Sequence, residues 1–84
     1  MVDETRDKAA KVAETLQARG HAEPAKTLST AAAAVEAVET VFLHGLRDAC
    51  QSALTAIEAI DPVSAMMIDE LRLEVDKRLT RHHS

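Results

Sequence analysis

The stretch "TAAAAVEAVETVFLHGLRDAC", residues 30–50, decides the fold because apolar side chains recur through it at helical spacing. A stripe that begins at Leu28 keeps its phase past Gly45 as far as Ile60. Its members are Ala31 or Ala32, Val35, Val38 or Glu39, Phe42, Leu46, Ala49 or Cys50, Ala53 and Ile57. A chain that turned at Gly45 would not need to keep this phase. The pattern therefore predicts one continuous helix over about residues 24–60, roughly 50 Å long at about 1.5 Å per residue.

Two shorter helices are predicted on either side of the long one. The first covers about residues 3–19 and ends at Arg19 and Gly20, before a turn that contains Pro24. Its apolar side is formed by Thr5, Ala9, Val12, Ala13 and Leu16. The last covers about residues 62–81, because Asp61 can cap a helix that has Pro62 at its first position. Its apolar side is formed by Val63, Met67, Ile68, Leu71, Val75 and Leu79. The expected fold is all-α, with a short, a long and a medium helix in a single domain of residues 1–84.

The composition indicates that this bundle is completed by a second copy of the chain. Apolar residues make up 46% of the 84, but sixteen of them are alanine and the only aromatic residue is Phe42. So thin a core is marginal for a chain of this size, and two short helices folded back on a long one leave much of its stripe exposed. We therefore expect a homodimer, and the alternative is a compact three-helix monomer with a bent long helix. The dimer interface is predicted at Val35, Val38, Phe42, Leu46, Ala53 and Ile57.

The charge pattern restricts the class of partner. The formal net charge is −4, and the ten Lys and Arg residues are interspersed with fourteen Asp and Glu residues. Such a chain lacks the concentrated basic face that nucleic acid requires. Its start is acidic, unlike a signal peptide, and no apolar run approaches the ~18 residues of a membrane span. We expect a cytoplasmic protein without nucleic-acid or membrane partners, in which the single Cys50 forms no internal disulfide and is buried.

Four carboxylates form the most suggestive chemical pattern. Glu36 and Glu39 give E-x-x-E, and Glu58 and Asp61 give E-x-x-D. This pattern resembles the metal-binding pattern of the all-α nucleoside triphosphate pyrophosphohydrolases, small helical dimers in which such carboxylates hold Mg²⁺. The resemblance implies Mg²⁺-dependent attack on a nucleotide. Along one straight helix the two pairs stand ~33 Å apart, so they could meet only across an antiparallel dimer or if the helix folded at Gly45. The lysines usual in that family are missing from residues 27–76.

A second resemblance concerns the C-terminal third of the chain. The segment "LRDACQSALTAIEAIDPVSAMMIDELRLEVDK" is similar to the last two helices of ferritin-like and Dps-like proteins, where a D-P-V-[ST] turn precedes the final helix. The iron-binding E-x-x-H of that family would fall near Glu74, where this chain has E-V-D-K instead. The resemblance implies a helical hairpin without the iron chemistry.

These observations favour a small self-associating helical module for assembly or protein-partner binding, without catalysis and without a cofactor. The nucleoside triphosphate pyrophosphohydrolase-like enzyme and the ferritin-like hairpin stay as alternatives. His44 lies nearly opposite the centre of the apolar stripe and is expected to be solvated or to contact a partner chain.

Overall fold

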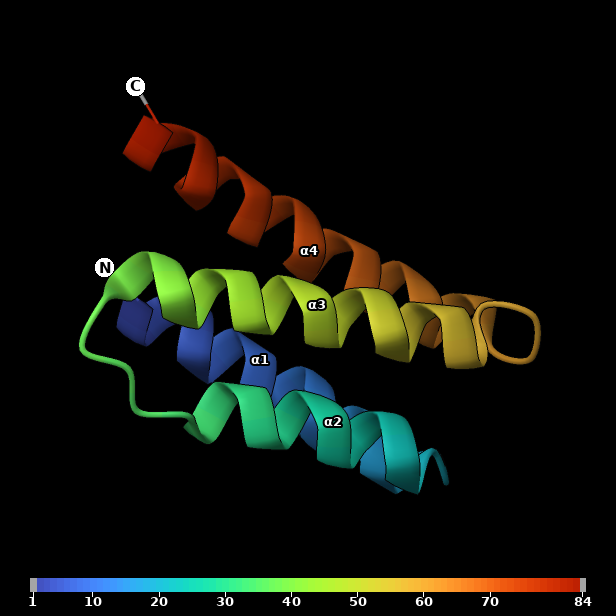
Figure 1. Ribbon diagram of the computed structural model, residues 1–84. Helices are drawn as coiled ribbons and strands as arrows, with labels where there is room; N and C mark the ends of the chain where they lie inside the picture. The colour runs from blue at the N-terminus through green and yellow to red at the C-terminus, as the bar shows by residue number, and fades with distance from the viewer. Residues whose placement is uncertain (1, 84) are drawn as a thin grey trace.

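The computed structural model describes the backbone of residues 2–83 and the side chains of residues 3–80. Four helices follow one another along the chain, and no strand occurs between residues 2 and 83 (Figure 1). They are α1 (Val2–Ala18), α2 (Ala22–Ala33), α3 (Glu39–Ile57) and α4 (Pro62–His83). The prediction of an all-α chain is therefore confirmed.

The four helices run alternately up and down around a shared core. Helix α1 packs on α2 and α4, and α3 packs on the same two neighbours. The α1–α2 turn and the α3–α4 turn lie at one end of the bundle, and the α2–α3 connection lies at the other (Figure 1). The longest dimension of the Cα trace is 37 Å, shorter than the single helix that the apolar stripe predicts.

The prediction of three helices with one continuous helix over residues 24–60 is wrong. Helix α2 ends at Ala33 and α3 begins at Glu39, with five non-helical residues between them. Ala34 and Val38 have extended backbone, with ψ of 134° and 123°. We call residues 34–38 the hinge. The break therefore lies several residues before Gly45, and α3 runs through Gly45 without interruption.

Tertiary packing explains why the chain bends where its local pattern continues. A straight helix cannot fold both halves of its apolar stripe onto one core, whereas two antiparallel helices can. Part of the lost helical hydrogen bonding is replaced from α1. The Arg6 guanidinium donates from Nη1 to the carbonyl oxygens of Ala32 and Ala34, at 2.7 and 3.0 Å. It also lies over the Phe42 ring, 4.5 Å from the centroid, where a cation–π contact is favourable.

Two predicted helix boundaries are confirmed. Gly20 has a φ of +86°, and the amides of Gly20 and His21 donate to the carbonyls of Gln17 and Leu16, as in a Schellman motif. At the other turn, the amide of Ser64 donates to Asp61 Oδ1 at 3.2 Å, which caps α4. Both turns lie at the same end of the bundle.

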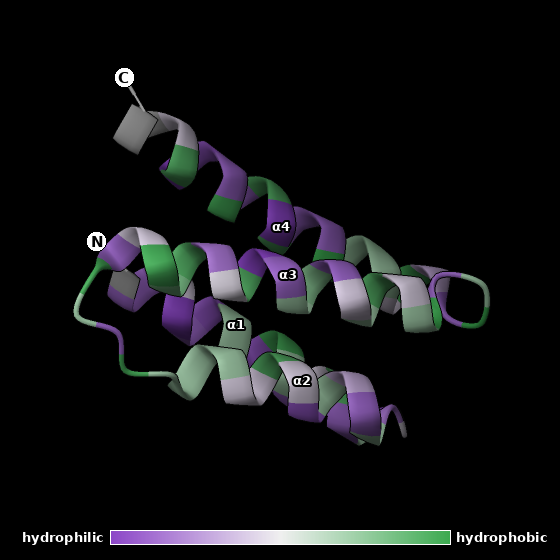
Figure 2. Cartoon of the chain, in the orientation of Figure 1, coloured by the Kyte–Doolittle hydropathy of each residue, from purple (hydrophilic) through white to green (hydrophobic). Residues whose placement is uncertain are grey.

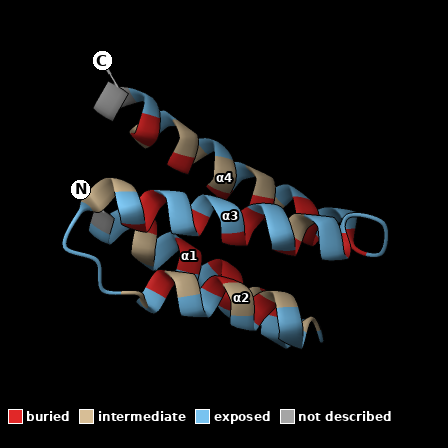
Figure 3. Ribbon diagram, viewed as in Figure 1, coloured by how far each residue is buried: buried red, intermediate tan, exposed pale blue. Residues whose placement is uncertain are grey.

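The core draws on all four helices and contains most of the predicted apolar positions (Figure 3). The predicted apolar side of the first helix is buried throughout. Val35 and Val38 are exposed because they lie in the hinge, and two more positions, Ile60 and Val63, are exposed because the helical phase restarts at the α3–α4 turn. Ile60 lies beyond the end of α3 and is 71% exposed, and Val63 is 60% exposed because α4 turns Ser64, Ala65 and Ile68 inward.

The contact between α1 and α4 is the thinnest of the four between neighbouring helices. Ion pairs cross it from Lys8 to Glu74 at 2.6 Å and from Arg78 to Glu4 at 3.5 Å. Two buried polar atoms beside this contact, Thr5 Oγ1 and Arg78 Nε, have no hydrogen-bond partner among the described residues. Such atoms lower the stability of a contact. The α1–α4 contact, which we call the α1–α4 seam, therefore leaves more of its buried polar atoms without hydrogen bonds than the rest of the described bundle.

The two glycines differ in what they require, and substitution by alanine should separate them. At Gly45 an added Cβ would meet no atom within 4 Å, so Gly45→Ala should raise the free energy of unfolding by up to ~1 kcal/mol through better helix propensity. Gly20→Ala should lower it by about 1 kcal/mol or more, because alanine is strained at a φ of +86°. Urea titrations of both variants would measure this. Destabilisation by Gly45→Ala would mean that α3 is interrupted or covered there.

Candidate functional site

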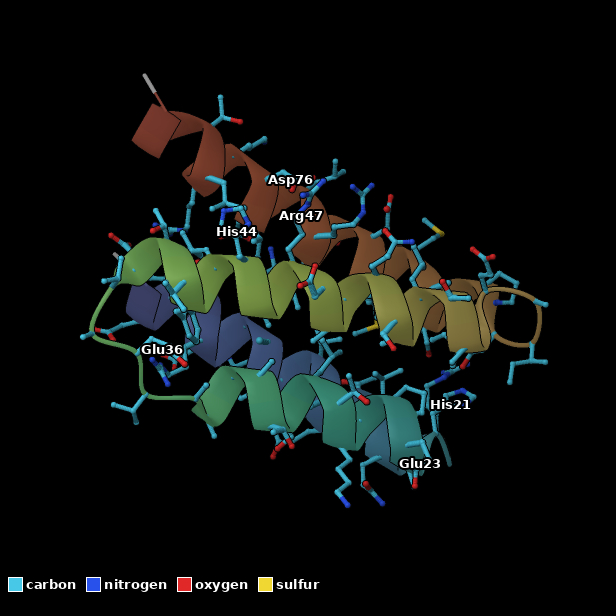
Figure 4. The ribbon with its side chains drawn as sticks, in the orientation of Figure 1. His21, Glu23, Glu36, His44, Arg47 and Asp76 are labelled. Carbon is cyan, nitrogen blue, oxygen red and sulfur yellow. The ribbon has the colours of Figure 1, made fainter. Side chains whose placement is uncertain are left out.

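Asp61 is the centre of the densest polar cluster in the described chain. Its carboxylate is 7% exposed and joins the two turns at one end of the bundle. Arg19 donates to both oxygens, from Nε to Oδ2 at 2.8 Å and from Nη2 to Oδ1 at 3.1 Å. His21 Nε2 lies 2.8 Å from Oδ2, and Ser64 Oγ donates to Oδ2 at 2.7 Å. Figure 4 places His21 at this end of the bundle.

The electrostatics of the cluster favour the charged carboxylate. The hydrogen bond from Arg19 lowers the pKa of Asp61 most, those from His21 and Ser64 lower it further, and burial opposes them in part. The net effect holds the pKa of Asp61 well below its usual range. The same pair raises the pKa of Arg19, again chiefly through its hydrogen bond to Asp61. At neutral pH both partners of this ion pair are therefore charged.

The cluster contains serine, histidine and aspartate, but these residues are not arranged for catalysis. We call the contacts of Asp61 with Arg19, His21 and Ser64 the Asp61 clamp. Both Ser64 and His21 bond to the carboxylate, so His21 is not placed to take a proton from the Ser64 hydroxyl. Ser64 is also fully buried, with 0% exposure, so a substrate has no access to it. The arrangement ties the α1–α2 turn to the α3–α4 turn.

The four carboxylates of the E-x-x-E and E-x-x-D pattern are not brought together. Glu36 lies in the hinge and Glu39 begins α3, whereas Glu58 follows the last residue of that helix. The 19 residues of α3 hold the two ends roughly 28 Å apart. Asp61 is already held by Arg19, His21 and Ser64. Among the residues that the structure describes, no group of three His, Cys, Asp or Glu side chains is arranged to hold a metal ion.

Position Glu74, where the ferritin-like pattern would place an iron ligand, instead carries an ion pair. Its Oε2 lies 2.6 Å from Lys8 Nζ. An open hollow of about 460 Å³ beside this pair, between α1 and α4, is lined by both acidic and basic side chains. A second hollow, of about 730 Å³, lies between α1 and α2 and is lined mainly by alanines. Neither hollow gathers a set of side chains suited to one reaction.

The positions predicted as an oligomer interface divide into two groups. Phe42, Leu46, Ala53 and Ile57 are buried in the core of the chain itself. Val35 and Val38 are 93% and 55% exposed. The dimer stays a prediction, and only the second group lies on the surface of the folded chain.

Most of the large exposed apolar side chains lie at the two ends of the bundle, with Leu73 of α4 exposed elsewhere, and sequence reasoning found them only in part. Val35, Val38 and Val41 form the hinge patch, at and just after residues 34–38 (Figure 2). The turn patch, around the α3–α4 turn, consists of Ile60, Val63 and Met66. Val35, Val38, Ile60 and Val63 belong to the predicted apolar stripes, so their exposure could not be read from periodicity, whereas Val41 and Met66 lie outside those stripes.

Two basic residues that organise the structure were missed at the sequence level. Arg6 and Arg19 look like ordinary solvated charges of α1 in the sequence. Their partners, the carbonyls of Ala32 and Ala34 for Arg6 and the carboxylate of Asp61 for Arg19, lie more than twenty residues away along the chain. No local signal points to such partners. An arginine just before a helix-ending glycine is common, so its position gives no hint of the role of Arg19.

A second acidic residue, Asp76, joins α3 to α4 through an ion pair. Its Oδ1 lies 2.8 Å from Arg47 Nε and its Oδ2 lies 3.1 Å from Arg72 Nη1 (Figure 4).

Cys50 is buried between α3 and α4, and desolvation raises the pKa of its thiol to about 12, with Arg72 opposing the shift and Asp76 adding to it. His44, in the same helix as Cys50, is exposed as predicted. The thiol is therefore held neutral and inert.

Comparison of the chain with protein-family models, with curated proteins and with solved structures finds no match. None of the helices within residues 2–83 combines the length and the apolar character needed to cross a bilayer. Function therefore has to be argued from the surface and contacts of the bundle.

Replacement of Asp61 by asparagine should weaken the fold in a pH-dependent way. The folded-state pKa of Asp61 is lowered, so its contribution is complete above the unfolded pKa near ~4 and is lost as pH falls below it towards the folded value. Asp61→Asn should therefore melt below the parent chain at pH 7, with a gap that narrows below about pH 4. Thermal melts from pH 2 to 7 would measure this, with the exposed Asp48→Asn as control. A gap that is constant with pH would contradict a charged Asp61 clamp.

Cys50 should react with alkylating reagents only when the bundle opens. At pH 8, a thiol with a pKa of about 12 has a thiolate fraction roughly a thousandfold below that of an unfolded chain. Iodoacetamide labelling followed by mass spectrometry should be slower in the native chain by at least that factor and should accelerate in urea together with unfolding. The control is Ser52→Cys in a Cys50→Ala background, which places a thiol at an exposed position of α3. Native labelling as fast as this control would contradict the buried placement.

Proposed function

We propose that this chain is a helical association module that binds other protein chains, a second copy of itself foremost, and catalyses no reaction. The observation that carries the proposal is the hinge patch, in which Val35, Val38 and Val41 are 93%, 55% and 51% exposed. Each buried aliphatic side chain contributes about 1.5–3 kcal/mol. A partner that covers these three therefore gains a large share of the free energy needed for specific binding.

The distribution of charge supports association through the ends of the bundle. The sides carry ion pairs between neighbouring helices, such as Lys8–Glu74 and Arg47–Asp76. Most of the large exposed apolar groups lie at the hinge and at the opposite turn, where Met66 is 65% exposed, and Leu73 of α4 is exposed away from both. Charged sides remain hydrated and disfavour lateral packing, so apolar ends direct where a partner binds.

The nucleotide-hydrolase alternative receives no comparable support. It needs Glu36, Glu39, Glu58 and Asp61 around one cation. Their separation along α3 and the engagement of Asp61 with Arg19 leave no common centre for a metal. The ferritin-like alternative concerns a hairpin shape and predicts no activity of its own.

Self-association can be tested by light scattering across a range of concentrations. We expect the mass to rise from one chain to two between about 1 and 500 µM. Val41→Gln should weaken the dimer by about tenfold, the equivalent of one partly buried valine side chain. Ala56→Gln, an exposed change on α3 outside both patches, should have no effect. A monomeric mass at every concentration would contradict the proposal.

A further inference from the structure

The hinge contains nothing that requires it to bend. Residues 34–38 read "AVEAV" and include neither glycine nor proline. Every non-glycine residue from 2 to 83 has a negative φ, so no hinge residue is held in the left-handed region. Ala34 already has a φ of −60°, and its ψ of 134° differs from a helical residue in that one angle. Val38, at φ −110° and ψ 123°, would have to change both angles, and because neither residue has a positive φ, rotation to helical values is open to both.

The apolar pattern also continues across the hinge. The stripe that begins at Leu28 keeps helical phase through Val35 and Val38 to Phe42. In the bent chain this helical spacing buries neither valine, because Val35 is 93% and Val38 is 55% exposed. Alanine and glutamate, which fill much of the hinge, favour helix. Local sequence preference and the observed bend are therefore in conflict at this point.

Few contacts oppose the straightening of the hinge. The Arg6 guanidinium holds the end of α2 through the carbonyls of Ala32 and Ala34. The other restraint is the core between the two hairpins, α1–α2 and α3–α4. That core can be formed equally well by hairpins from two different chains, since nothing in it depends on the hinge being covalently bent.

We propose that two copies of this chain exchange helical hairpins by straightening residues 34–38 into helix. Helices α2 and α3 would join into one helix over residues 22–57, roughly 54 Å long. The α1–α2 hairpin of each copy would pack on the α3–α4 hairpin of the other. The Arg19–Asp61 ion pair, which joins the two hairpins in the bent chain, would form between chains. This inference rests on the proposed function of self-association and specifies its geometry.

The exchange leaves the core unchanged and alters only the hinge. Each copy gains the helical hydrogen bonds of residues 34–38 and loses the two that Arg6 makes to Ala32 and Ala34. The two straightened segments would cross near the two-fold axis, where the exposed Val35 and Val38 of one chain can cover those of the other. Because the hairpins must separate before they exchange, the dimer should form and dissociate slowly.

A proline in the hinge tests the exchange by mass. Val35→Pro suits the bent chain, because Ala34 has the extended ψ that precedes proline and the Val35 amide has no hydrogen-bond partner among the described residues. In a continuous helix the same proline is strongly disfavoured, and each dimer contains two of them. Val35→Pro should lower the dimer association constant by at least about a hundredfold. The matched control, Val35→Ala, removes the same apolar contact but favours helix, so it should lower the constant by no more than about tenfold.

A distance within one chain provides a second test, with the native hinge. Spin labels at Lys26→Cys and Asp48→Cys, in a Cys50→Ala background, would report on α2 and α3 from two exposed positions. The labelled chain would be mixed with an excess of unlabelled Cys50→Ala chain and refolded from urea. In the dimer fraction, the two labelled positions of one chain should then lie far apart, with about 33 Å between their backbones. The monomer fraction should show the short distance of neighbouring helices, about 10 Å between axes.

The outcomes separate this inference from the proposed function. A dimer that shows the long distance and is abolished by Val35→Pro but not by Val35→Ala supports hairpin exchange. A dimer with the short distance that both variants weaken alike overturns the exchange and leaves self-association standing, as contact between intact bundles. A chain that is monomeric at every concentration overturns both.

Discussion

The apolar stripe from Leu28 to Ile57 has to be kept from water, and the bend at residues 34–38 is how one chain covers it. The stripe is too long for the two flanking helices to cover while it remains straight. Bent at the hinge, its two halves face each other, and α1 and α4 close the remaining sides. The hinge gives up helical hydrogen bonds and exposes Val35 so that Leu28, Leu46 and the rest of the core can be buried.

Much of the fold was predictable because its signals are local. The all-α class, the end of α1 at Gly20 and the start of α4 after Asp61 each follow from residues within one turn of the boundary. The break between α2 and α3 was not predictable in this way. Its five residues carry helix-forming chemistry, and the forces that bend them come from the distant core and from Arg6. Helical phase can thus persist through a segment that is not helical.

The candidate site shows the same division between local and distant causes. Asp61 was identified as a capping residue and is one, but its ion pair with Arg19 and its contact with His21 join segments about forty residues apart. The carboxylate pattern predicted a possible metal centre from spacing alone. Spacing along α3 also separates those carboxylates, since a rigid helix keeps Glu39 and Glu58 at its opposite ends.

The order of packing around the bundle has a consequence for folding kinetics. Each helix packs on the next one in the chain, and only the α1–α4 seam joins the two ends of the sequence. Chains with such local contacts fold on the order of microseconds to milliseconds. The seam has the longest loop to close, and Thr5 and Arg78 leave it with unsatisfied polar atoms. It should therefore form last and open first, so that α4 detaches from α1 before the hairpins lose their own structure.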